Sequence, residues 1–160
     1  MKNVVEAGLA IIIAFILYTI LSKISLSLLQ TFNVFSIIVI CFAIIKGEIF
    51  GAFMGTFCGL IHDSFSLGVF GVSGLIETII GFLAGYFSRK INVVSFFRSF
   101  TFIFIVAMAD TVLSIILYSV IYPGSINMKG GLIFFQPLNT AFFGTFVLLL
   151  LRRIRSRNGE

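Results

Sequence analysis

The sequence predicts an all-α integral membrane protein, a bundle of six transmembrane helices in a single domain over residues 1–160. The first observation behind this is composition: hydrophobic residues make up 59% of the chain and charged residues only 11%. A soluble domain of this length needs a polar coat, which so few charged residues cannot supply. The second observation is the spacing of the apolar runs, and the third is the position of the basic residues at their ends.

The apolar residues fall into six runs, each compared with the roughly 20 residues that span a hydrocarbon core about 30 Å thick. The predicted spans are about 7–22, 26–45, 47–62, 67–87, 99–122 and 132–151. The first run is interpreted as a retained helix, and the second follows Lys23. The third is short and rich in glycine, and the fourth begins after the polar break at 64–66. The fifth ends at Pro123-Gly124 and the sixth at Arg152.

The basic residues predict the orientation of these spans. An even number of spans places both termini on one side, and that side receives nine of the eleven lysines and arginines. They are Lys2, Lys46, Arg89, Lys90, Arg98, Arg152, Arg153, Arg155 and Arg157, whereas the other side holds Lys23 and Lys129. Because cytoplasmic loops are enriched in basic residues, both termini are expected in the cytoplasm. The net charge of +5 is therefore a topology signal, and no nucleic acid partner is expected.

Glycines recur at helical spacing in the third and fourth predicted spans. The first row is Gly47, Gly51, Gly55 and Gly59, and the second comprises Gly74, Gly81 and Gly85, with Glu77 on the same face. Glycine inside a helix costs roughly 1 kcal/mol in water, so such rows indicate that two helix backbones approach closely. We expect these helices to form a tight antiparallel pair. The alternative is a groove that accepts the helix of another protein.

Three acidic residues lie within or beside the spans. We expect Asp63 to accept backbone N–H bonds at the start of the following helix, where Gly68 and Gly71 allow close approach. Glu77 and Asp110 fall near the middle of their helices, where a charge costs about 2.5–3.5 kcal/mol. No Lys or Arg lies at that depth, so these two acids are either protonated or hydrogen-bonded to hydroxyl and amide groups. The candidate neighbours are Thr78, Thr111, Ser114 and Asn139.

Two roles are open for Glu77 and Asp110: a proton or cation site, or hydrogen bonding between helices or to a partner's transmembrane helix. His62 beside Asp63 does not make a catalytic pair, because consecutive helical residues do not face each other. The chain contains no second His and no nucleophile constellation. We therefore expect no enzymatic activity, no metal and no cofactor.

The last span combines a proline with a basic end. Pro137 is expected to kink or open the helix and to free a carbonyl group, which Asn139 or a neighbour satisfies. Arg152, Arg153 and Arg155 then follow the apolar run. This basic segment is expected to anchor the chain to anionic lipid, with contact to a cytoplasmic partner as the alternative.

Together these features resemble the rod shape-determining protein MreD family. The resemblance is carried by Gly59-Leu60-Ile61-His62-Asp63, by the turn to Leu67-Gly68, by Pro137-Leu138-Asn139 and by the run through Leu151 into Arg152-Arg153. The length, the apolar segments and the short basic tail extend it over nearly the whole chain. The motif positions that it carries over are Asp63, Gly55, Gly59 and Gly68, whereas Glu77 and Asp110 match no motif.

The resemblance implies a multi-pass subunit of the bacterial cytoplasmic (inner) membrane that has no catalytic activity and serves cell elongation. The implied partners are an MreC-like bitopic protein, the MreB filament, a SEDS glycosyltransferase and a class B penicillin-binding protein. We expect the glycine-lined face to bind the transmembrane helix of the bitopic partner.

The family is also thought to be similar in fold to the substrate-binding subunits of energy-coupling-factor transporters, which supplies a rival hypothesis. A vitamin-binding subunit would have this size, and the small residues Ala10 and Ala14 fit the docking of a coupling partner loosely. Such a subunit needs a polar cavity that opens outward, whereas tryptophan is absent here and the outer loops are sparse. An integral membrane enzyme is the third hypothesis. It ranks below the other two because the sequence contains no catalytic constellation.

Overall fold

The computed structural model describes residues 2–24, 33–65, 70–91, 93, 95–121 and 132–157. All regular structure within these residues is α-helical. The six helices are α1 (Lys2–Ile24), α3 (Val34–Lys46), α4 (Glu48–Phe65), α5 (Val72–Lys90), α6 (Phe96–Ile121) and α7 (Leu132–Arg157). The prediction of an all-α fold with six helices is confirmed for the part of the chain that the structure describes.

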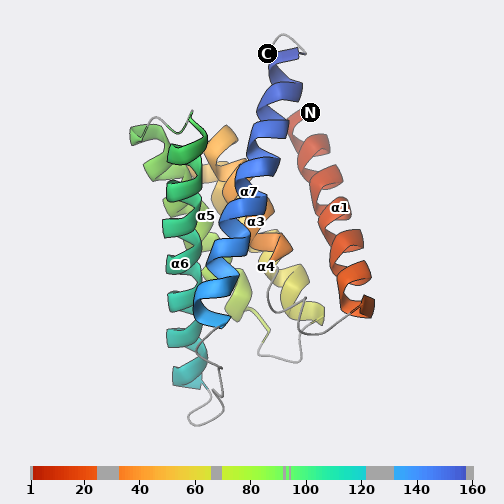
Figure 1. Ribbon diagram of the computed structural model, residues 1–160. Coiled ribbons are helices and arrows are strands. Elements are labelled where there is room, and N and C mark those ends of the chain that lie inside the picture. The colour runs from red at the N-terminus through yellow and green to blue at the C-terminus, as the bar shows by residue number, and fades with distance from the viewer. Residues whose placement is uncertain are drawn as a thin grey trace.

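Successive helices run in alternating directions, so that the start of α1 and the end of α7 lie at the same end of the bundle (Figure 1). The ends of α3 and α5 and the start of α6 lie there too. This end therefore carries Lys46, Arg89, Lys90, Arg98, Arg152 and Arg153, while Lys23 lies at the opposite end of α1. The up-and-down arrangement separates the basic residues as the sequence predicts.

The short helix α3 is the centre of the bundle. It contacts each of the other helices, whereas α1 packs chiefly against α3. One hydrophobic cluster joins α3 to α5, α6 and α7 through Ile40, Ile80 and Ile103. A second cluster joins the opposite side of α3 to α1 and α4 through Ala14, Val39 and Met54. None of the residues of α3 is exposed, which follows from its position between the two clusters.

The start of α3 differs from the prediction. The apolar run had placed the second span at 26–45, but the helix begins at Val34, and residues 25–32 lie outside the described part of the chain. Asn33 is the N-cap, and its side chain accepts a hydrogen bond from the Ser36 backbone N–H at 3.3 Å. A helix of 13 residues rises about 20 Å, less than a bilayer's hydrocarbon core of about 30 Å.

The other boundaries shift by smaller amounts. The third span extends to Phe65, the fourth begins at Val72 and ends at Lys90, and the last continues to Arg157. By length and composition, two described helices are long and apolar enough to cross a membrane, over Phe96–Ile121 and Phe134–Arg153. The stretches Gly8–Ile20 and Val34–Lys46 are shorter apolar helices.

Candidate functional site: a glycine seam and a buried acid cluster

The glycines of α4 lie directly against the backbone of α5. A Cβ atom added at Gly55 would overlap the carbonyl group of Glu77, and one at Gly51 would overlap the carbonyl oxygen of Gly81. A Cβ atom at Gly59 would lie 2.5 Å from the Cα of Gly74. No side chain fits at these positions, because real Cβ atoms essentially never approach a backbone atom this closely.

The contact is reciprocal along α5. A Cβ atom at Gly81 would meet the Gly51 carbonyl, and one at Gly85 would lie 2.6 Å from the carbonyl carbon of Gly47. Gly74 is less confined, since its nearest neighbour is the Leu60 side chain at 3.2 Å. We call this contact the glycine seam.

The expected antiparallel pair is therefore present, and the glycine rows of α4 and α5 pack directly against each other. The alternative, that this face is an open groove for a foreign helix, is wrong.

Asp63 forms hydrogen bonds that cap one end of the glycine seam. Its carboxylate, only 3% exposed, accepts the backbone N–H groups of Gly71 at 2.8 Å, Ser73 at 3.0 Å and Gly74 at 3.3 Å. These are free donors of the first turn of α5, where a negative charge also meets the positive end of the helix dipole. Gly71, the N-cap of α5, has φ +99°, a left-handed conformation that suits glycine. The bonds expected of Asp63 are present, whereas Gly68 lies outside the described residues.

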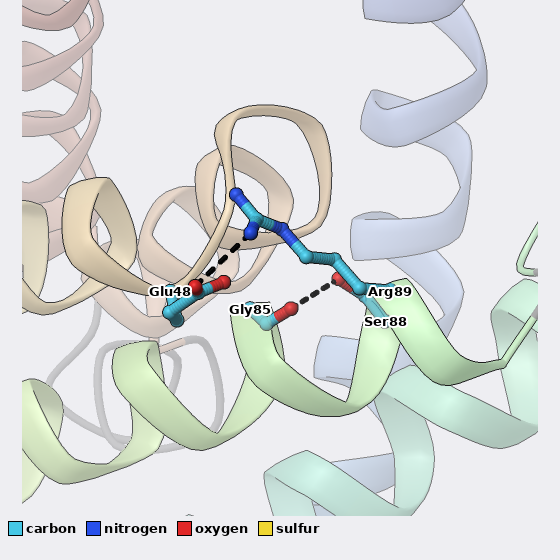
Figure 2. Close-up of polar contacts among 4 residues, drawn as sticks. All are labelled: Glu48, Gly85, Ser88 and Arg89. Carbon is cyan, nitrogen blue, oxygen red and sulfur yellow. Dashed lines mark hydrogen bonds and ion pairs between the residues drawn. The ribbon is translucent and has the colours of Figure 1, made fainter.

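A different polar contact closes the other end of the seam. Arg89 Nη1 on α5 donates a hydrogen bond to Glu48 Oε1 at the start of α4, at 3.0 Å, and Ser88 Oγ donates to the Gly85 carbonyl (Figure 2). The Arg89 side chain is 62% exposed. Gly47, the single residue between α3 and α4, has φ +98° and lies beneath the Arg89 guanidinium. The α4–α5 pair thus has a buried carboxylate at one end and an exposed ion pair at the other.

A second buried site lies on another face of α5. It consists of Asn33 and Ser36 from the start of α3, Glu77 from α5 and Asp110 from α6, which we call the acid cluster. Ser36 is completely buried, and Glu77 and Asp110 are each 4% exposed. The Ser36 hydroxyl contacts Oε1 of Glu77 and, at 2.9 Å, Oδ2 of Asp110. The two acids that the sequence left unconnected are therefore neighbours.

The neighbours predicted for these acids are not the observed ones. The Thr78 hydroxyl donates to the Gly74 carbonyl and contacts Thr56, and the Thr111 hydroxyl donates to the Ala107 carbonyl. Each threonine thus bonds the preceding turn of its own helix, which is the usual outcome for a hydroxyl in a helix. The sequence did contain one signal for the true partners: Asn33 followed three residues later by Ser36 is an N-cap pattern that places both at a helix start.

Positive charge is scarce around the acid cluster. Among the described residues, no Lys or Arg forms an ion pair with Glu77 or Asp110. The side-chain donors to these acids in the described part of the chain are the Ser36 hydroxyl and the Asn33 amide, whose nitrogen lies 3.5 Å from Oδ2 of Asp110. The start of α3 adds a helix dipole, equivalent to about half an elementary charge. Oε2 of Glu77 is buried and has no hydrogen-bond partner among the described residues. The cluster is rich in acceptors and short of donors.

A separate group of polar contacts lies one turn away from Glu77, beside Asp63. Ser73 lies one turn before Glu77 on α5, and its hydroxyl is 3.2 Å from His62 Nδ1 and 3.2 Å from the Tyr118 hydroxyl. The His62 ring also packs edge-on against Tyr18, with ring centroids 5.9 Å apart. His62 and Asp63 thus contact different atoms of Ser73, the hydroxyl and the backbone N–H, and as consecutive helical residues they do not face each other.

The last helix places its predicted residues apart from the acid cluster. Pro137 is buried inside α7, which continues as one helix on both sides of it. No described hydrogen bond joins Asn139 to Glu77 or Asp110. Arg152 Nη1 donates to the Val93 carbonyl, which ties the end of α7 to the connection between α5 and α6. Arg153 is exposed, and the side chain of Arg155 lies outside the described part of the structure.

Comparison of the chain with protein-family models, with curated proteins and with solved structures gives no match. The glycine seam and the acid cluster therefore carry the functional argument.

Proposed function

We propose that this chain is a membrane-embedded, non-catalytic scaffold subunit of the bacterial cell-elongation complex. The observation that carries the membrane placement is the distribution of side chains between surface and interior. The peripheral helices expose large apolar side chains, for example Ile12 on α1, Phe53 on α4, Phe82 on α5, Ile105 on α6 and Phe146 on α7. In water such a surface would aggregate, whereas in lipid it costs nothing.

The charge distribution supports the same placement. The basic residues at the ends of α3, α5 and α7 and at the start of α6 share one end of the bundle. By the positive-inside rule this end faces the cytoplasm, together with both termini. Arg153 is free to meet anionic lipid, and Arg152 holds the bundle's own connection at Val93.

The scaffold role is supported by how the motif residues of the MreD resemblance are used. Gly55 and Gly59 form the glycine seam, and Asp63 closes its end. These residues make one rigid helix pair and hold no reactive group. In this proposal the bundle presents its outer helix faces to an MreC-like bitopic protein, and through it to MreB, a SEDS glycosyltransferase and a class B penicillin-binding protein.

One observation favours the second candidate, a substrate-binding subunit of an energy-coupling-factor transporter. The interior of the bundle contains polar side chains from α3, α5 and α6 at adjacent turns, among them Ser36, Ser73 and Asp110. A bound vitamin would need such groups as hydrogen-bonding partners.

Depletion of the protein in its own rod-shaped host distinguishes the two candidates. We expect cells to become round and to be restored by the wild-type chain and by Gly8→Leu, since a Cβ at Gly8 meets nothing within 4 Å. Gly55→Leu should fail to restore shape and to retain the bitopic partner in detergent co-purification. A nutrient requirement with normal cell shape would overturn the scaffold role and support the transporter.

A further inference from the structure

The acid cluster holds more negative charge than its protein surroundings compensate. Two carboxyl groups, each 4% exposed, share a single hydroxyl donor, that of Ser36. That hydroxyl has one hydrogen, so it can donate to Glu77 or to Asp110 but not to both. If both acids were ionised, one of the two contacts between the Ser36 hydroxyl oxygen and a carboxylate oxygen would have no hydrogen between the two oxygens.

The start of α3 reduces this charge without cancelling it. Its dipole is worth about half an elementary charge, against two full charges on the acids. Oε2 of Glu77 is left buried without a hydrogen-bond partner among the described residues. A buried, unpaired carboxylate is costly in any low-dielectric interior, so the cluster lacks one positive charge.

We propose that Glu77 and Asp110 together bind one exchangeable monovalent cation, a proton or a sodium ion, with Ser36 and Asn33 completing the site. The Glu77 and Asp110 carboxyl groups and the Ser36 hydroxyl supply oxygens, the donor set of hard cations and of a shared proton, while the Asn33 amide nitrogen donates to Asp110. The site lies at the start of α3, where the positive end of the helix dipole offsets only part of the negative charge of the two acids. This inference does not depend on the scaffold role and would hold equally for a transport subunit.

Other titratable groups lie near the acid cluster and have to be separated from it. Cys58 on α4 lies within electrostatic reach of Glu77. His62 on α4 and Tyr118 on α6 both contact Ser73, one turn before Glu77. His62→Gln is therefore the control for titration on α4, and Glu48→Gln is the control for a carboxyl that already has a cation partner, Arg89.

The first test is modification by dicyclohexylcarbodiimide, which reacts with protonated carboxyl groups in apolar surroundings. The purified full chain in detergent is labelled across a pH series in choline chloride, and the modified residue is located by mass spectrometry. We expect modification at Glu77 or Asp110 that falls as the pH rises, unchanged in His62→Gln and in Glu48→Gln. Replacing choline chloride with sodium chloride distinguishes the two occupants. If sodium protects the acids from modification, the occupant is sodium; if the labelling is unchanged, the occupant is the proton.

Three results would overturn the proposal: no modification of either acid, modification that depends on neither pH nor sodium, or protection by calcium or magnesium alone. The last would assign the site to a divalent ion.

The second test measures thermal unfolding of the same samples. A cation that binds only the folded state stabilises it by mass action. For a proton, the unfolding equilibrium constant of the wild type should rise up to about tenfold per pH unit, over the range in which the folded state holds one proton more than the unfolded chain. For sodium, the melting temperature should rise with sodium concentration at fixed pH. Glu77→Gln should remove either dependence, because it takes away one of the two negative charges and leaves the Ser36 hydrogen free to be donated to the remaining carboxylate of Asp110. A wild-type melting temperature that responds to neither pH nor sodium would contradict the proposal.

Discussion

Two faces of α5 are held in opposite ways. Towards α4 the helix presents glycines, and the contact is made of backbone atoms that leave no room for a Cβ atom. Towards α3 and α6 it presents Glu77, and the contact is made of side chains whose fit depends on where the hydrogens are. Glu77 belongs to both, since its carbonyl group touches Gly55 while its carboxyl group reaches Ser36. The first face is fixed by backbone atoms, whereas the fit of the second depends on which of its oxygens carries a hydrogen.

The largest expected effect comes from breaking the glycine seam. Gly55→Ala puts a methyl group into the Glu77 carbonyl, and backbone overlap cannot be relieved by a rotamer change. We expect a loss of about 3 kcal/mol or more in the free energy of unfolding. Unfolding in mixed micelles measures it, with Gly8→Ala as the matched control, which should be neutral or stabilising by up to about 1 kcal/mol. Equal behaviour of the two variants would show that the seam is not tight.

The next effect comes from the capped end of the seam. Asp63→Ala leaves the N–H groups of Gly71, Ser73 and Gly74 buried without their acceptor. We expect a loss of about 2–3 kcal/mol in unfolding free energy. Asp63→Asn should lose less, because an amide oxygen still accepts hydrogen bonds. If the two variants unfolded alike, the charge and not the hydrogen bonding would be responsible.

Removing the Ser36 hydroxyl, which lies between the two acids of the acid cluster, should have a smaller effect. Ser36→Ala takes away the one hydroxyl between Glu77 and Asp110, and we expect a loss of about 1–2 kcal/mol in unfolding free energy. Thr145→Val is the control, since Thr145 is equally buried but bonds only the Ala141 carbonyl of its own helix. A larger loss in the threonine variant would mean that Ser36 does not support the acids.

The smallest effect is expected at the end of the glycine seam that carries the Arg89–Glu48 ion pair. Arg89→Ala removes an ion pair whose arginine is 62% exposed, so we expect a change of about 0–1 kcal/mol that shrinks further in high salt. A double-mutant cycle with Glu48→Gln isolates the pair. A coupling energy well above this range would show that the pair is shielded from solvent.

The features that the sequence predicted correctly are local ones. The glycine rows and Asp63 lie within or next to the two helices that they join, so spacing alone placed them on facing surfaces. The partners of Glu77 could not be found in this way, because Ser36 is 41 positions away and its contact depends on how three helices pack. The start of α3 was missed because the prediction ran one span across the polar residues Ser27, Gln30 and Thr31, although the Asn33 cap marks the helix start. The resemblance to the MreD family and the partners that it implies stay predictions.

The central position of α3 has a consequence for communication across the molecule. Phe35 faces α1, where its ring lies 5.4 Å from the Tyr18 ring, centroid to centroid. Ser36, the next residue on the same helix, faces the two acids. A tilt of this thirteen-residue helix would therefore move Phe35 against α1 and Ser36 against the two acids at the same time.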